Sequence, residues 1–585
     1  MTISKKLINK TLFIISVLGG LSQLSAVEMM PETDEAYQER MQWFTDAQFG
    51  LFIHYGVYST LGGEWRGKPI QKYAEWIQRW GAIKTDEYIP LAANFRPDKL
   101  DADLWVKTAK EAGMKYMVIT AKHHEGFCLW DSELTEYDLG DTNDFDRDIL
   151  GELKAACDKY GLKFGTYYSI LDWHHPTQRI EQAGFQSPMS DKAAYTAYMK
   201  GQLKELIERY DPAIMWFDAD WVRWWEEEDG IDLYNYLREL SPEMIINNRY
   251  SKRGPTVKDF GTPENSTPSA ALDHIWEACW TVNRSWGYKK SDKSWKTTEQ
   301  LIQKQIDINT KGGNLLLNVG PYGDGSWPEN STNLLLQMGE WNQAHAEAVY
   351  ETKYLEAVAQ KWGKLAQSKA SDAESGEIFA YVFDWPEDGI IQIRGLTAAN
   401  VEASTYDGKP LPVKIGAEDL ELDISSATAQ PYATVFRLKY SGGLKAKEVT
   451  NQLELSGNEL ILQAGTAKLS GSELTLKDNT VITGWTKPSD VATWDFNVPA
   501  PGKYTAVILY SMEIKGKAIV SLKVGDKTLK SKFEPTKSVE DFRVAYLGEM
   551  NLNEVGDTKG SIQFQRINQK TPFNLQTIYF VPVSD

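Results

Sequence analysis

The stretch AIMWFD (213–218) shows a pattern that recurs along the first 350 residues: an apolar run of strand length, followed directly by a polar residue. FGLFIH (49–54) and NLLLN (314–318) repeat it, and amphipathic helical segments such as 104–112 and 193–210 separate runs of this kind. Strands that alternate with helices predict a parallel sheet. The length and the number of runs favour a closed (β/α)8-like barrel of the TIM type over an open sheet.

Most of the predicted strands end in polar or aromatic residues. Examples are HYG (54–56), KHHE (122–125) and NR (248–249). In a (β/α) barrel these ends converge on one face, where active sites lie. No Gly-rich phosphate loop follows the first strand, which argues against a nucleotide cofactor, and no cofactor is expected.

The pattern changes after about Tyr350, where short alternating strands replace the helical periodicity. Turn signals at short intervals are typical of β-sandwiches. We therefore expect a catalytic barrel over 27–349, a β-sandwich over 350–445, and an accessory β-sandwich over 446–585.

The first 26 residues have the features of a cleavable export signal. Lys5, Lys6 and Lys10 precede an apolar run at 12–18, and LSA (24–26) provides small residues at a cleavage site. An amphipathic first helix is the alternative. The apolar run is too short to span a bilayer, so we expect a secreted or periplasmic protein without a membrane anchor.

Composition narrows the classes of partner. The net charge of −18 argues against nucleic acid and anionic membranes, since phosphates bind to basic surfaces. Three cysteines make no disulfide framework. Among 21 tryptophans, most precede residue 345, and large flat rings offer stacking surfaces to sugars. The oligomeric state is left open.

Glycoside hydrolysis requires two carboxyl groups, one on each side of the bond that is cleaved. Asp218 is the leading candidate because it ends an apolar strand, although a helix N-cap is the ordinary role of an aspartate there. Glu277, among Trp and Cys, is expected to be desolvated and to have a raised pKa. Glu264 is the alternative, on a predicted loop.

Five histidines could in principle form a metal site. His123 and His124 are adjacent, His54 ends another strand, and His174 and His175 follow a third. Their spacing lacks helical i, i+4 pairing and cysteine partners, so we expect no metal. Hydrogen bonding to sugar hydroxyls is the preferred interpretation, and satisfied core histidines are the alternative.

Eight stretches in order resemble the α-L-fucosidases of glycoside hydrolase family 29. They are FGLFIHYG (49–56), YAEWI (73–77), AKHHEGFCLWDS (121–132), GTYYS (165–169), MWFDADW (215–221), NNR (247–249), WEACWTVNRSWGY (276–288) and KGGNLLLNVGPYGDG (311–325). Tyr55 stands where the family usually has Trp, and Glu125 where it usually has Asp.

The resemblance implies a retaining exo-enzyme that removes terminal α-L-fucosyl residues from oligo- or polysaccharides. It implies that Asp218 is the nucleophile and favours Glu277 over Glu264 as the acid/base. The residues that it places around the sugar are His54, Glu75, Trp76, His123, His124, Tyr168, Trp216, Arg249 and Trp286.

Two alternatives concern the function of the protein, and a further question concerns its last domain. A related exo-glycosidase would accept L-galactose-like sugars, which carry a hydroxyl on C6. A sugar-binding protein without catalysis would lack one carboxyl, yet Asp218, Glu264 and Glu277 are all present. The last β domain resembles accessory modules of secreted glycosidases, for which carbohydrate binding and simple packing are both considered.

Overall fold

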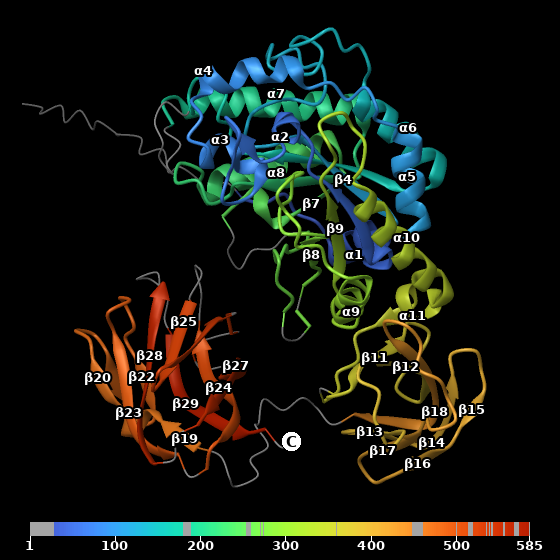
Figure 1. The fold of residues 1–585 in the computed structure, drawn as a ribbon, viewed down its shortest axis with the longest axis vertical. Coiled ribbons are helices and arrows are strands. Elements are labelled where there is room, and N and C mark those ends of the chain that lie inside the picture. Colours follow the sequence, from blue (N-terminus) through green and yellow to red (C-terminus); the bar gives the residue numbers. More distant parts are fainter. Residues whose placement is uncertain are drawn as a thin grey trace, which may run out of the picture.

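The computed structural model describes most of the chain, from residue 28 to residue 583 (Figure 1). Outside the described residues lie 1–27, 180–188, 253–258, 269–270, 273, 359, 447–459, 499, 513–518, 534, 537–538, 540–541, 554–555, 567–572 and 584–585. The predicted export signal at 1–26 therefore falls outside them.

A parallel sheet of seven strands forms the N-terminal domain. Its strand order is β7-β6-β5-β4-β1-β9-β8. The strands are β1 (Phe49–Ile53), β4 (Tyr116–Lys122), β5 (Lys163–Ser169), β6 (Ile214–Asp218), β7 (Ile245–Ile246), β8 (Glu277–Thr281) and β9 (Asn314–Val319). Helices that pack on the outside are α5 (Ala102–Glu111), α6 (Ile149–Tyr160), α7 (Lys192–Tyr210), α8 (Glu227–Leu240), α9 (Thr298–Asn309) and α10 (Glu329–Ala344). The predicted TIM-type barrel with its crossover helices is confirmed.

The segment 260–265 lies between the two edge strands of this sheet. Phe260 forms a parallel bridge with Asn247 beside β7, and Glu264 forms one with Cys279 in β8. The backbone N–H of Glu277 donates to the carbonyl of Gly261 (2.8 Å). This segment occupies the position of an eighth strand. Glu264, which the sequence places on a loop, therefore lies in a segment that is bridged to residues at both edges of the sheet.

Helix α1 (Asp34–Ala47) contributes to the core inside the barrel. Its Phe44 is fully buried and its ring centroid lies 4.6 Å from that of Phe260 and 5.5 Å from that of Tyr116. Tyr116 begins β4, and Asn314, which begins β9, donates through its side-chain amide to the carbonyl of Phe44. Because these residues start strands, α1 covers the end of the barrel opposite the predicted active site.

The C-terminal half is built from antiparallel strands, as predicted. One six-stranded sheet contains β10 (Thr352–Lys353), β11 (Gly363–Ser368), β12 (Ser375–Val382), β18 (Thr434–Ala446), β14 (Leu396–Thr405) and β15 (Pro410–Leu411). A three-stranded sheet of β13 (Ile390–Ile393), β17 (Leu420–Asp423) and β16 (Val413–Ile415) shares its core.

The last described region has two further antiparallel sheets around a core of its own (Figure 1, orange to red). One contains β21 (Thr475–Lys477), β22 (Val481–Thr483), β29 (Phe573–Pro582), β24 (Gly502–Met512) and β27 (Arg543–Leu552), with β19 (Leu460–Gln463) paired to β29. The other contains β20 (Lys468–Ser470), β23 (Val491–Val498), β28 (Gly556–Arg566), β25 (Ile519–Val524) and β26 (Lys527–Lys532).

None of the helices in the described part of the chain is both long and apolar enough to cross a membrane.

Replacing Phe44 by alanine should destabilise the barrel by about 3–5 kcal/mol, since it leaves a cavity between α1 and the strand starts. Urea unfolding followed by tryptophan fluorescence measures the change. The control is Leu104→Ala on α5, where the leucine is 57% exposed and the expected change is below about 0.5 kcal/mol. Equal shifts for the two variants would contradict the packing role of α1.

Candidate active site

Asp218 ends β6 at the carboxyl end of the sheet. Its Oδ2 accepts a hydrogen bond from the hydroxyl of Tyr167 (3.0 Å) and lies 3.7 Å from Nε2 of His124. Its Oδ1 accepts from Nη1 of Arg249 (2.9 Å). The carboxylate is thus oriented by two donors, and its side chain remains 17% exposed.

Arg249 links two carboxylates. Its Nη1 binds Asp218, and its Nη2 donates to Oε2 of Glu264 (3.1 Å). Nε donates to the hydroxyl of Thr262 (2.9 Å), and the guanidinium lies over the ring of Trp216, 4.6 Å from its centroid. Since the side chain of Arg249 is only 3% exposed, these contacts fix its plane and, with it, the relative position of the two acids.

Glu264 lies at the mouth of the site. Its side chain is 41% exposed, and its position on the segment 260–265 brings it to the guanidinium that holds Asp218. The contact with Arg249 places both carboxyl groups on one cation, with Glu264 on the solvent side.

Glu277 lies deeper, at the start of β8, and is fully buried. Its Oε1 accepts from the indole N–H of Trp216 (2.9 Å), and its Oε2 accepts from the hydroxyl of Tyr116. A Cβ on Gly50 would lie 2.4 Å from the Tyr116 ring, so the glycine leaves the room this ring needs. Burial raises the pKa of Glu277 to about 7. The expected desolvation is present, but the indole of Trp216 lies between this carboxyl and Arg249.

The three predicted histidines lie together. The ring centroids of His123 and His124 are 4.2 Å apart, and that of His54 is 5.5 Å from His123. Nδ1 of His54 is 2.7 Å from Oδ1 of Asn318, and Nδ1 of His124 is 2.7 Å from the hydroxyl of Ser169. These contacts leave Nε2 of both rings for other partners.

Burial keeps these imidazoles neutral. It lowers the pKa of His54 to about 3 and that of His124 to about 4, and it also lowers the pKa of His123. Nδ1 of His123 is buried without a hydrogen-bond partner in the structure. A neutral ring with an unused polar atom suits hydrogen bonding to a sugar hydroxyl.

Glu75, in the short helix η1 (Ala74–Trp76), is buried. Its Oε2 accepts from the backbone N–H of Gly287 (3.0 Å) and from the hydroxyl of Ser285 (3.3 Å). Oε1 is buried without a partner, and burial raises the pKa of the carboxyl to about 7. This unused oxygen is a second candidate contact for a polar ligand.

Three indoles complete the walls. Trp286 is 7% exposed with its centroid 5.1 Å from His54, and Trp216 is 1% exposed and stacks on Tyr167 at 5.6 Å. The ring of Trp76 meets the edge of His124 at 5.0 Å. Apolar faces therefore alternate with polar donors around Asp218.

The prediction for Tyr168 is wrong. This side chain points away from the site, where its hydroxyl donates to Gln202 of α7 (2.7 Å) and accepts from Lys122. Its neighbour Tyr167 contacts Asp218 instead. Because successive side chains of a strand face opposite sides, an error of one residue exchanges inside and outside.

Sequence reasoning also missed Asn318 and Thr262, which orient His54 and Arg249. Asn318 was visible as the polar end of an apolar strand. Thr262 carried no such signal, since its segment lacks a strand pattern.

His174 and His175 take no part in the site. The ring of His174 stacks on Tyr137 at 4.2 Å, and Nδ1 of His175 is 2.8 Å from the hydroxyl of Thr177.

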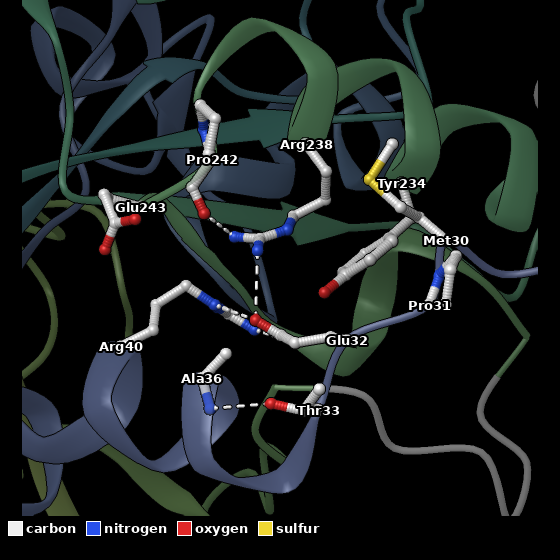
Figure 2. A pocket seen from close by; sticks show the side chains of 10 residues that line it. All are labelled: Met30, Pro31, Glu32, Thr33, Ala36, Arg40, Tyr234, Arg238, Pro242 and Glu243. Carbon is white, nitrogen blue, oxygen red and sulfur yellow. Dashed lines mark hydrogen bonds and ion pairs between the residues drawn. The ribbon is translucent and has the colours of Figure 1, made fainter.

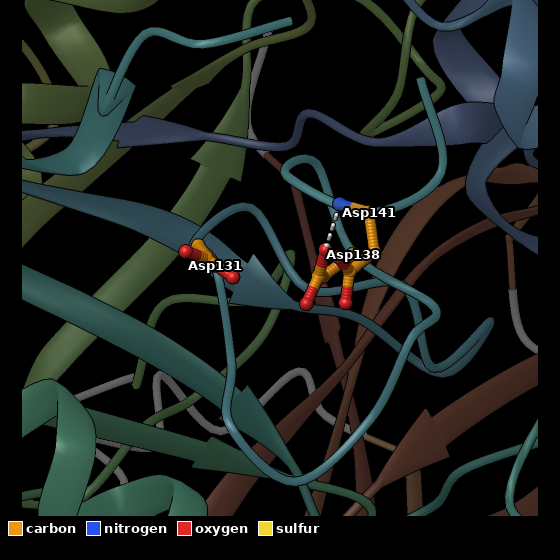
Figure 3. A group of neighbouring side chains, drawn as sticks. All are labelled: Asp131, Asp138 and Asp141. Carbon is orange, nitrogen blue, oxygen red and sulfur yellow. Dashed lines mark hydrogen bonds between the residues drawn. The ribbon is translucent and has the colours of Figure 1, made fainter. Parts of the chain in front are cut away.

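Among the described residues, one group has the ligand spacing of a metal site: Asp131, Asp138 and Asp141, after β4 (Figure 3). The buried Asp138 accepts from the backbone N–H groups of Ser132 and Asp141, so its carboxylate already holds the loop.

A separate hollow of about 310 Å³ lies between α1 and α8 (Figure 2). Its cations are already neutralised, because Glu32 pairs with both Arg40 and Arg238, and Arg40 also pairs with Asp259. Both arginines of the lining are therefore already paired with carboxylates.

Paired carboxylates at the carboxyl end of a parallel β/α barrel, with indoles and neutral imidazoles around them, are typical of glycoside hydrolases. A family model described as Alpha-L-fucosidase matches residues 21–347. The chain belongs to this family, glycoside hydrolase family 29.

Relatives agree with this assignment. An α-L-fucosidase of Dictyostelium discoideum is 27% identical over 465 residues, which cover 73% of this chain and 99% of the relative. The structure of α-L-fucosidase isoenzyme 1 from Paenibacillus thiaminolyticus is 31% identical, with a TM-score of 0.61 over 69% of this chain and 99% of that one. A Bacteroides thetaiotaomicron α-L-fucosidase, trapped as a covalent intermediate, is 28% identical, with a TM-score of 0.63 over 72% and 98%.

The buried Glu277 should make stability depend on pH. Its pKa is about 7 in the folded chain against an ordinary 4.5, so between these values the native state holds more protons than the unfolded state. From this group alone, the free energy of unfolding should therefore fall by up to about 3 kcal/mol as the pH rises from 4.5 to 7, and change little above 7. The lowered pKa values of His54 and His124 act in the opposite direction, because these groups hold fewer protons in the native state than in the unfolded state.

Glu277→Gln removes this contribution, whereas those of Glu75 and the histidines remain, so the pH slope of the free energy of unfolding should be more positive in the variant than in the parent between pH 4.5 and 7. Thermal unfolding between pH 4.5 and 8 at constant ionic strength measures it. An unchanged slope in Glu277→Gln would refute the buried protonated state.

Proposed function

We propose that this protein is a retaining exo-α-L-fucosidase that releases terminal α-L-fucosyl residues from oligo- or polysaccharides. The observation that carries the proposal is the pair of carboxylates on Arg249, with Asp218 inside the pocket and Glu264 at its mouth. Fucose lacks a hydroxyl on C6, so its pocket needs an apolar surface beside donors for the other hydroxyls. The indoles and neutral imidazoles provide both.

In the first step, Oδ2 or Oδ1 of Asp218 attacks the anomeric carbon, and the acid/base protonates the departing oxygen. Tyr167 and Arg249 hold the aspartate for in-line attack. In the second step the same acid/base, now a carboxylate, takes a proton from water, which displaces Asp218 from the sugar. The trapped covalent intermediate of the Bacteroides thetaiotaomicron enzyme, obtained with a glutamate-to-glutamine variant, supports this chemistry.

We assign the acid/base role to Glu264 rather than to Glu277, which the sequence favoured. An acid/base must reach the leaving group and then a water molecule. Glu264 is 41% exposed and contacts the guanidinium that holds Asp218. Glu277 is fully buried beneath Trp216, and both of its oxygens already accept hydrogen bonds. Its contacts suit it to orient the Trp216 indole.

Three alanine variants test the assignment on a fucoside with a good leaving group, with and without azide. Asp218→Ala should lose nearly all turnover, and azide should restore it with an inverted product. Glu264→Ala should yield fucosyl azide of retained configuration, and it should lose about 10²–10⁴-fold on a disaccharide that needs a proton donor.

Glu277→Ala is the comparison and should form no azide adduct. NMR of the anomeric proton identifies each product. Near-normal turnover of Asp218→Ala would refute the mechanism, and an azide product from Glu277→Ala would return the acid/base role to that residue.

We also propose export of the protein with cleavage after Ala26, on the basis of the leader-like sequence at 1–26. Expression of the full chain in a Gram-negative host should give a periplasmic or secreted protein whose N-terminus is Val27 by mass spectrometry. Replacing Leu12 and Ile15 by Asp should keep the uncleaved chain in the cytoplasm. Cytoplasmic retention of the parent chain would contradict the proposal.

A further inference from the structure

Trp221, on the loop after β6, is a large aromatic residue that is partly exposed to solvent. Trp221 is 41% exposed, whereas the pocket indoles Trp216 and Trp286 are 1% and 7% exposed. It comes three residues after Asp218 in the chain. An exposed indole near a catalytic carboxylate suggests a ligand-binding surface, because covering its apolar area with a ligand would be favourable in free energy.

The backbone on both sides of Trp221 is fixed. Ala219 has a φ of 71°, and its carbonyl accepts from the N–H of Val222 (3.1 Å), which closes a tight turn. Nζ of Lys252 donates to the carbonyls of Asp220 (3.1 Å) and Val222 (2.5 Å). The loop is thereby clamped across the residue, and the ring is presented without further ordering.

The ring of Trp221 is also oriented. It stacks on Trp76, with centroids 5.9 Å apart and planes 26° apart, and it is T-shaped to His124, with the two ring centroids 6.2 Å apart. His124 in turn reaches Asp218 at 3.7 Å. The exposed indole is therefore a continuation of the pocket wall toward the solvent.

We propose that Trp221 is the stacking platform for the leaving-group sugar, and this rests on the proposed function. In an exo-enzyme the terminal sugar fills the buried end of the pocket, so the departing sugar passes through the mouth. At the mouth, Trp221 is 41% exposed as a whole residue. The side chain of Glu264, the proposed proton donor, is also 41% exposed. The ligand class is a pyranose that lays the apolar face of its ring on the indole.

The test compares two substrates that share the fucosyl group. One is α-L-fucosyl fluoride, whose leaving group has no ring. The other is whichever of the α-(1→2), (1→3), (1→4) and (1→6) fucosyl disaccharides the parent enzyme cleaves fastest. For Trp221→Ala, kcat/KM on the disaccharide should fall roughly three- to tenfold, while kcat/KM on the fluoride and inhibition by free L-fucose stay within twofold.

Two further variants separate stacking from support of Trp76. Trp221→Phe keeps an aromatic face and should recover most of the loss on the disaccharide. Trp80→Ala is the matched control, because its ring also stacks on Trp76, at 6.2 Å and 29°. It should not distinguish the two substrates.

Equal losses of Trp221→Ala on both substrates would mean that the ring only supports the fucose pocket, and would overturn the proposal. So would an unchanged disaccharide rate, or a parent enzyme that cleaves the fluoride but none of the disaccharides. A parent enzyme inactive on fucosyl fluoride would instead refute the proposed function, so the two failures are distinguishable.

Discussion

The bridge that Arg249 makes between Asp218 and Glu264 is the interaction on which the site depends. Two acids at one substrate repel each other when both are charged, and a buried guanidinium is the cation that can bind both with fixed geometry. Thr262 and the face of Trp216 hold that guanidinium in place. The fold brings these groups together from three places: Trp216 and Asp218 from β6, Arg249 from the turn after β7, and Thr262 and Glu264 from the segment in the eighth strand position.

The barrel interior is layered, and each layer gives its acid a different environment. Near the strand starts, α1 and Tyr116 enclose Glu277, where burial raises the pKa of the carboxyl. The indole of Trp216 forms the next layer. Above it lie Arg249 and Asp218, where solvent and substrate can enter. Depth therefore separates Glu277, which holds an indole, from Asp218 and Glu264, to which we assign the reaction.

The neutral histidines follow from the same burial. His54, His123 and His124 have pKa values lowered by desolvation, so they approach a sugar as hydrogen-bonding groups without charge. This leaves Arg249 as the cation nearest to Asp218, the proposed nucleophile, among the contacts described. In the proposed mechanism, Glu264 alternates between carboxylate and proton donor beside this one cation.

Local pattern determined the parallel barrel, the β-rich C-terminal half, Asp218 and the histidines, because apolar strand runs with polar ends are visible in one dimension. Tertiary structure alone decided which face Tyr167 and Tyr168 take, since a strand alternates and register is set by neighbours. It also decided that Glu264, and not Glu277, shares the guanidinium of Arg249 with Asp218. The segment 260–265 has no strand pattern of its own and is held by β7 and β8, and burial of Glu277 arises from residues far apart in the chain.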